Sequence, residues 1–254
     1  MNYSWDFLVY FKQSVTGEGV YWRLLASGLG WTVLLSLSAW VLALVLALGI
    51  GIARTLPSPL LRWPAAVYVH CFRNIPLLVQ VFLWFYVVPE LLPEAIGRAI
   101  KQAPATTSQF LTMLLALTLF TAAKAAELVR AGIESVPRGQ KQAAMAMGLG
   151  FVDSYRLVIV PQALRIIVAP LTSDFMNVFK NSAVALTIGL MELTGRTRQF
   201  SEFSAQPFEA FLAATLIYMG VTWCVVLLMR HVETRLRIPG RRGADVWMAS
   251  TGVP

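Results

Sequence analysis

Charged side chains are scarce in this sequence of 254 residues. Asp, Glu, Lys and Arg make up 13% of it, about half of the ~25% found in an ordinary soluble domain. Hydrophobic residues make up 57%, and the mean hydropathy is +0.65. Too few polar side chains remain to cover a soluble globule. The composition therefore argues against a disordered chain, a coiled coil and a soluble nucleic-acid-binding protein, and it indicates an integral membrane protein.

Residues that form disulfides, hold metals or bind nucleotides are also scarce. The sequence has two cysteines, Cys71 and Cys224, and two isolated histidines, His70 and His231, which are too few for a disulfide framework or a metal site. It has no G-x-x-x-x-G-K-[ST] loop to hold a nucleotide. We therefore expect no cofactor, no metal and no catalytic residue, and we expect any ATP hydrolysis to occur in a separate partner subunit.

Long apolar runs predict five membrane-spanning helices. The run 31–52 carries no charge and is long enough, at ~1.5 Å per residue, to cross a hydrocarbon core of ~30 Å. The other predicted spans are 65–88, 110–126, 166–190 and 210–229. Pro76 predicts a break or kink near the start of the second span. The sequence thus predicts an all-α fold in which residues 1–254 form a single polytopic domain.

The positions of Lys and Arg predict the orientation, because these residues are retained on the cytoplasmic side of short loops. Of the 21, fourteen lie in one alternating set of loops and the carboxyl-terminal tail, six lie in the opposite set, and Lys180 lies within a span. The fourteen are Arg54, Arg62, Arg73, Lys124, Arg130, Arg138, Lys141, Arg156, Arg165, Arg230, Arg235, Arg237, Arg241 and Arg242; the six are Lys12, Arg23, Arg98, Lys101, Arg196 and Arg198. We therefore expect the amino terminus outside and the carboxyl terminus in the cytoplasm.

The segment 137–161, between the third and fourth spans, is long for a loop in a helical bundle and rich in helix formers. Pro137 can begin a helix, and Gly148 can end it because glycine takes the left-handed conformation at little cost. Asp153 and Ser154 are typical of a second helix start, and Pro161 is expected to close that helix. The sequence predicts two short helices joined by a turn, on the cytoplasmic face.

This segment resembles the E-A-A-x-x-x-G-x9-I-x-L-P loop of the permease subunits of bacterial ABC importers, which docks into a groove on the ATP-hydrolysing subunit. The matching positions are Gln142, Ala143, Ala144, Gly148, Val158, Val160 and Pro161. Glutamine in place of glutamate keeps the length and the hydrogen bonding but loses the charge, and valine keeps the apolar character of the later positions. The resemblance therefore implies the docking geometry of this loop without a salt bridge from Gln142.

Other segments are similar to permeases for polar amino acids. FRNIPLLVQ at 72–80 looks like the F-R-G-T-P-L-L-V-Q segment of that subfamily, with Asn74 in place of glycine. AAELVRAGIESVPRGQKQAAMAMGL at 125–149 and MNVFKNSAVALTIGL at 176–190 are similar to the matching stretches of that subfamily. Together with VVPELLP at 87–93, these segments look most like the glutamate/aspartate branch.

This resemblance implies a multi-pass permease of the bacterial inner membrane for polar, acidic amino acids, working by alternating access. Its implied partners are two ATP-binding cassette subunits, a second permease that is identical or paralogous, a periplasmic substrate-binding protein and the lipid bilayer. It implies no nucleic acid.

Polar residues in the predicted fourth span are candidates for a substrate path. Asp174, Asn177 and Asn181 recur at spacings of three and four, on one stripe of a helix, with Lys180 at its edge. A charge at mid-membrane costs roughly 2.5 to 3.5 kcal/mol. These side chains are therefore expected to face a cavity, another helix of the bundle or a second permease.

An acidic amino acid carries two carboxylates and one ammonium group. Lys180 with Lys124 would supply the cations for the former, and Asp174 or Glu127 the acceptor for the latter. For Lys124 and Glu127 a second interpretation stands beside this one, in which they form a solvated ladder with Arg130 at the cytoplasmic end of the third span.

The sequence lacks the features of two other classes of membrane protein. An ion-coupled secondary carrier commonly shows internal repeats, and we find no repeat or inverted pair of halves. A membrane-embedded enzyme requires a cluster of His, Cys or carboxylate groups at workable spacing, which the sequence lacks. Both classes are therefore disfavoured.

The fourteen-to-six bias of basic residues predicts the outcome of a topology experiment. A reporter active only in the periplasm is expected to work when fused after Lys101 and to fail when fused after Arg156 or Arg242. Reporter activity after Arg156 would contradict the five-span arrangement.

Overall fold

The structure is a computed structural model that describes residues 3–15 and 17–236. The described chain is helical apart from its turns and one isolated bridge between Gln13 and Val20. The basic residues Arg237, Arg241 and Arg242 of the predicted cytoplasmic tail lie outside the described residues.

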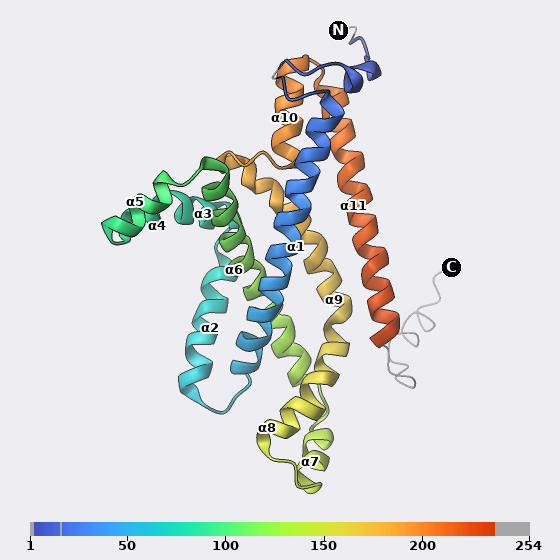
Figure 1. Ribbon diagram of the computed structural model, residues 1–254. Helices are drawn as coiled ribbons and strands as arrows, with labels where there is room; N and C mark the ends of the chain where they lie inside the picture. The colour runs from blue at the N-terminus through green and yellow to red at the C-terminus, as the bar shows by residue number, and fades with distance from the viewer. Residues whose placement is uncertain (1–2, 16, 237–254) are drawn as a thin grey trace.

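Figure 1 shows an elongated bundle with the amino-terminal segment at one end and α7 and α8 at the other. The longer helices are α1 (Tyr21–Ala53), α2 (Pro59–Asn74), α6 (Ala105–Glu134), α9 (Val160–Asn181), α10 (Leu193–Ser204) and α11 (Pro207–Leu236). The shorter elements are η1 (Phe7–Phe11), α3 (Leu77–Phe82), η2 (Leu83–Val87), α4 (Val88–Leu91), α5 (Glu94–Gln102), α7 (Arg138–Ala146), α8 (Phe151–Asp153), η3 (Ser154–Ile159) and η4 (Ser182–Ile188).

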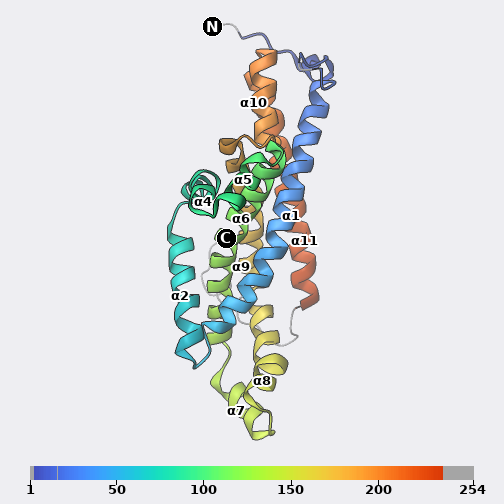
Figure 2. The same cartoon turned by 60° about the vertical axis from the view of Figure 1, so that its left-hand side comes forward.

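Within the described residues, four helical stretches are long and apolar enough to cross a membrane: Tyr21–Ala53, Ala105–Glu134, Phe151–Ile188 and Pro207–Leu236. A fifth crossing is counted if the bent pair Pro59–Asn74 and Leu77–Leu91 forms one span. The predicted class, an all-α polytopic membrane protein, is confirmed. Figure 2 shows α2 on the outside of the bundle, where it packs against α6.

The second predicted span is broken at Pro76, as the sequence indicates. The two halves meet at 106°, and Ile75 between them is extended, because the residue before a proline is disfavoured in the helical conformation. Pro76 has no N–H to donate to the carbonyl of Phe72. The buried side chain of Gln80 takes over this role, since its Nε2 donates to Phe72 O at 2.8 Å and to Ile75 O at 2.9 Å.

Pro161 does not close a helix, contrary to the sequence-based expectation. The helical stretch runs from Phe151 through Pro161 into α9. The turn before the proline is the π-helical η3, in which the N–H of Val160 bonds to Tyr155 O, five residues back. A wide turn relieves the clash between a proline ring and the carbonyl four residues earlier. The π-helical η2 ends two residues before Pro89 in the same way.

Small residues bring α1 and α6 close together. Ala39, Ala43, Ala47 and Gly51 follow one another at every fourth position of α1 and are all buried, which is the pattern that lets membrane helices approach closely. A Cβ on Gly51 would lie 2.5 Å from Val129 Cβ and 2.9 Å from the carbonyl oxygen of Ala126. The α1–α6 contact is the most extensive helix pair in the described chain.

The amino-terminal segment is tied to the start of α11 at the end of the bundle far from α7 (Figure 1). The carboxylate of Glu209 accepts hydrogen bonds from the Tyr3 hydroxyl and, at 2.8 Å, from the N–H of Asp6. The Tyr10 hydroxyl donates to Glu209 O at 2.8 Å. Glu209 is buried, so these bonds offset the cost of removing its carboxylate from water.

The close α1–α6 contact predicts that Gly51→Ala destabilises the protein by about 1 to 3 kcal/mol, the usual cost of forcing an extra carbon into a packed interface. The matched control is Gly49→Ala, two residues earlier, where an added Cβ meets no described neighbour within 4 Å. That change should leave stability equal or slightly higher, because alanine favours helix over glycine. Thermal unfolding in detergent measures both, and equal melting temperatures would argue against the close contact.

Candidate coupling and translocation site

Gly148 ends α7 in the left-handed conformation, as the sequence predicts. Its φ is 80°. The N–H of Gly148 bonds to Met145 O at 2.9 Å, and that of Leu149 bonds to Ala144 O at 3.1 Å. These two bonds form a Schellman motif, which reverses the chain at a helix end. The turn directs the chain from α7 into α8.

The residues that match the docking loop divide between the surface and the interior. Gln142 and Ala143 are exposed on α7, whereas Ala144 is fully buried and anchors the helix. Val158, Val160 and Pro161 are half-buried at the start of the long helix. The surface also carries exposed large apolar side chains, which the motif does not include: Met145, Met147, Phe151, Val152 and Leu157.

Such a concentration of exposed apolar side chains on one end of a protein is typical of an interaction surface. We refer to these five residues as the apolar end patch. They lie on α7, on the turn that follows it, on α8 and on η3, which form the end of the bundle in Figure 1. The composition of the segment, with its two methionines, is the signal from which the patch was predictable.

Side chains at the root of the loop attach it to the rest of the bundle. The Tyr155 hydroxyl donates to Thr55 O, just after α1, at 3.3 Å. Lys141 Nζ lies 5.6 Å from the ring centre of Phe151 and 6.0 Å from that of Tyr155, within the range of cation–π attraction. The loop is therefore held to both α1 and its own second helix.

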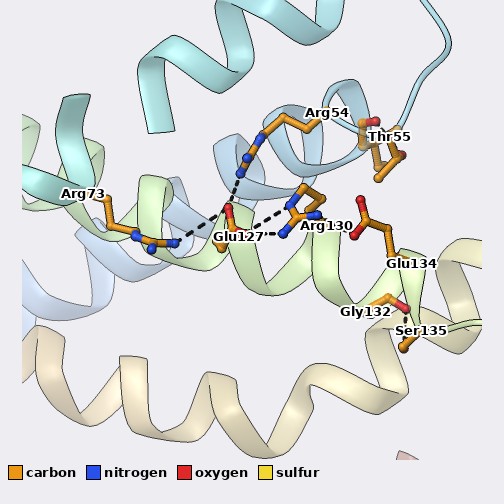
Figure 3. Close-up of polar contacts among 9 residues, drawn as sticks. Arg54, Thr55, Arg73, Glu127, Arg130, Gly132, Glu134 and Ser135 are labelled. Atoms are coloured by element: carbon orange, nitrogen blue, oxygen red, sulfur yellow. Dashed lines mark hydrogen bonds and ion pairs between the residues drawn. The ribbon is translucent and has the colours of Figure 1, made fainter. Parts of the chain in front are cut away.

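Glu127 on α6 is the centre of a charge network close to this root (Figure 3). Its carboxylate pairs with Arg54 after α1, with Arg73 on α2 at 3.7 Å, and with Arg130 one turn along α6, whose Nε donates at 3.1 Å. Arg130 also pairs with Glu134. The half-buried carboxylate thus joins three helices, which is more than a ladder along one helix face would do.

Lys124 is not part of that network. Its Nζ lies 3.7 Å from Asp174 Oδ1 on α9, and the Asp174 side chain is 14% exposed. The structure therefore brings two of the substrate-path candidates together across the α6–α9 contact. Asn177 is half-buried on the same stripe of α9.

Lys180 lies elsewhere. It is exposed and lines a shallow groove with Tyr218, Met219, Thr222, Trp223 and Val226 of α11. Asn181, the next residue, is half-buried. Lys124 and Asp174 pair with each other and not with Lys180. Six residues along a helix correspond to about one and two-thirds turns, so Asp174 and Lys180 lie on different faces.

Glu192 is a buried acid that the sequence analysis missed. It precedes α10 and accepts a hydrogen bond from the N–H of Gly195 at 3.0 Å, so it caps that helix. Its Oε2 also accepts from Thr32 of α1 at 3.2 Å and from the Tyr218 hydroxyl of α11 at 3.0 Å. Burial raises the pKa of the Glu192 carboxyl above its ordinary value, and these hydrogen bonds oppose that rise. A lone acid before a helix start was the available signal.

Comparison with known families decides the class of the protein. Residues 43–238 match the family described as the binding-protein-dependent transport system inner membrane component. The chain belongs to this family. Its resemblance to the permeases of ABC importers is thereby confirmed, as is its assignment to a multi-pass protein of the inner membrane. The family consists of membrane subunits and not of enzymes, and membership implies a separate ATPase, a substrate-binding protein and a second permease as partners.

Two curated relatives and one solved structure are similar over most of the chain. The glutamate/aspartate import permease protein GltJ of Escherichia coli strain K12 is 43% identical over 96% of this chain and 99% of its own length. The glutamate/aspartate import permease protein GltK of Escherichia coli O6:H1 is 30% identical over 83% and 92%. The crystal structure of an amino acid ABC transporter with histidines superposes with a TM-score of 0.70 at 27% identity, covering 85% of this chain and 95% of that one.

The Glu127 network predicts that Glu127→Gln destabilises this permease by roughly 1 to 3 kcal/mol, because three arginines lose their shared charged acceptor. Glu134→Gln on the same helix is the control. Glu134 is more exposed, and among the described residues it pairs only with Arg130, so its loss should change stability by less than ~1 kcal/mol. Thermal unfolding of the purified subunits measures both. If Glu134→Gln is as destabilising as Glu127→Gln, the contacts of Glu127 with three helices do not make a larger contribution to stability.

Proposed function

We propose that this permease imports acidic amino acids, glutamate or aspartate, and that the segment 137–161 couples it to two ATP-binding cassette subunits. The observation that carries the substrate class is the 43% identity to GltJ over nearly the full length of both chains. Its second permease is proposed to be a paralogue, because Escherichia coli O6:H1 has both a GltJ and a GltK. The amino terminus is proposed to be periplasmic and the carboxyl terminus cytoplasmic.

The proposed coupling site is the apolar end patch together with Gln142, Ala143, Ala144, Gly148, Val158, Val160 and Pro161. Exposed methionines and aromatic side chains suit an apolar groove on a partner. ATP binding draws the two ATPases together, and the loop moves with them. Because α8, η3 and α9 form one continuous helical stretch, a displacement of the loop moves α9 directly, without a flexible joint at Pro161.

The proposed substrate path includes the Lys124–Asp174 pair, with Asn177 and Asn181 on the same helix as Asp174. An acidic amino acid offers a carboxylate to Lys124 and an ammonium group to Asp174, so it can exchange with the internal ion pair as the helices move. Lys180 and Glu127 have separate surroundings. Lys180 faces the groove on α11, where a contribution to the path requires a further subunit, and Glu127 is held by three arginines.

Reconstituted transport tests the function. The permease pair, the ATPases and the cognate binding protein in proteoliposomes are expected to accumulate labelled glutamate or aspartate only when ATP is present. Omission of the ATPase subunit should abolish uptake. Uptake that persists without it would support an ion-coupled carrier, and ATP-driven uptake confined to neutral or basic amino acids would overturn the proposed substrate class.

The coupling role predicts different effects for two nearby glycines. Gly148→Val places a branched side chain at φ 80°, which costs roughly 1 to 2 kcal/mol or more and disrupts the turn after α7. Uptake is expected to fall at least tenfold, with poor co-purification of the ATPases. The control is Gly150→Val, where φ is −62° and the space is also open; it should retain most uptake. Normal uptake by Gly148→Val would remove this turn from the mechanism.

A further inference from the structure

A pocket of about 270 Å³ lies beside the root of the coupling loop, between the end of α1 and α7. Its lining comes from the α1–α2 connection, α2, the end of α6, α7 and η3. Four of the lining side chains are cationic, namely Arg54, Arg62, Arg138 and Lys141, and one, Glu134, is anionic. The pocket is therefore strongly basic.

Most of this positive charge has no counterion in the part of the chain that the structure describes. Glu134 is already paired with Arg130, and Arg54 is paired with Glu127. Arg62 and Arg138 form no ion pair within residues 3–15 and 17–236, and Lys141 interacts with the faces of Phe151 and Tyr155. Three positive charges around one cavity repel each other, so the pocket is complementary to an anion with several acceptor oxygens.

The amino-terminal end of α7 strengthens the preference of the pocket for an anion. Arg138 is the first residue of this nine-residue helix, and its N-cap, Pro137, provides no side-chain hydrogen bond. Uncapped N–H groups and the positive end of the helix dipole favour a phosphate oxygen. The lining Tyr155 hydroxyl is already directed to Thr55, which leaves the cations and the helix end as the groups that contact a ligand.

The position of the pocket favours the headgroup of a lipid over free phosphate as its anionic ligand. Arg54 is the first charged residue after the apolar run 31–52, which places the pocket at the level of lipid headgroups. On α2, Arg62 is flanked by the exposed apolar side chains of Leu60, Leu61 and Trp63. A phospholipid with its phosphate in the pocket can lay its acyl chains along these apolar side chains. Free phosphate has no apolar part with which to cover them.

We propose that this basic pocket binds the headgroup of an anionic phospholipid from the leaflet on the side of the coupling loop. Basic pockets between helices at a membrane surface are suited to such headgroups. The bound lipid contacts both the α1–α2 connection and α7, so it restricts the motion of the coupling loop relative to the bundle. Such a lipid site requires neither a particular transported substrate nor a particular orientation of the chain in the membrane.

The test uses the permease complex in nanodiscs of phosphatidylglycerol or of phosphatidylcholine, with retained lipid counted by native mass spectrometry. Arg62→Gln with Arg138→Gln is expected to lower phosphatidylglycerol retention about 25-fold, at about fivefold per positive charge removed. The matched control is Arg156→Gln with Arg165→Gln. Both of these arginines are exposed, on η3 and the first turns of α9, and lie outside the pocket lining. Retention of phosphatidylglycerol should therefore change less than twofold.

A titration of the unmodified complex covers the case in which the double variant fails to fold. Phosphatidylglycerol should raise its melting temperature in phosphatidylcholine nanodiscs, and millimolar inorganic phosphate or glycerol 3-phosphate should not. An equal rise in melting temperature with inorganic phosphate would show that the pocket binds free phosphate and would overturn the proposal of a lipid ligand. Unchanged lipid retention in the double variant would overturn the site, and loss of the ATPases with lipid retained would instead assign the pocket to subunit docking.

Discussion

The carboxylate of Glu127 joins three helices at the point where the bundle meets its coupling loop. Removing the Glu127 carboxylate and the largely buried Arg54 guanidinium from water is costly. Their contact with each other, with Arg130 and with the more exposed Arg73 offsets that cost. Arg54 follows α1, Arg73 is in the last turn of α2 and Arg130 is on α6, so the convergence fixes how these three helices are placed against one another. Arg54 precedes the turn that receives the Tyr155 hydroxyl. The charge network therefore lies next to the root of the loop, because Arg54 and Thr55 are consecutive residues.

Two prolines show what the sequence specifies and what it leaves open. Pro76 breaks the second predicted span, and the break was predictable because the preceding Ile75 is forced into an extended conformation. Pro161 was expected to act in the same way, but the π-helical turn η3 carries the helix through it. A π turn depends on packing around the turn and leaves no mark in composition or spacing. The role of Gln80, eight residues from the carbonyl it satisfies, is visible only in three dimensions.

The candidate residues divide along the same line. The left-handed conformation of Gly148 was predictable, because a glycine after a helix-forming run is a local signal. The stripe of Asp174 and Asn177 was also predictable, from helical periodicity. The partner of Asp174 was not, since the choice between Lys124 and Lys180 depends on how α9 rotates against α6. Glu192 was missed because its partners, Thr32 and Tyr218, are 160 and 26 residues away in the chain.

The continuity of α8, η3 and α9 has a mechanical consequence for this permease. A loop that ended at Pro161 would rotate on a hinge, and much of its displacement would be lost before reaching the membrane. A continuous helical stretch instead transmits translation and rotation to Asp174, which lies more than three turns beyond Pro161. The Lys124–Asp174 pair joins this moving helix to α6, and α6 carries Glu127. Under the proposed coupling, motion of the loop would strain this ion pair while the Glu127 network holds α1, α2 and α6 together. That is the division between a moving and a fixed part that alternating access requires.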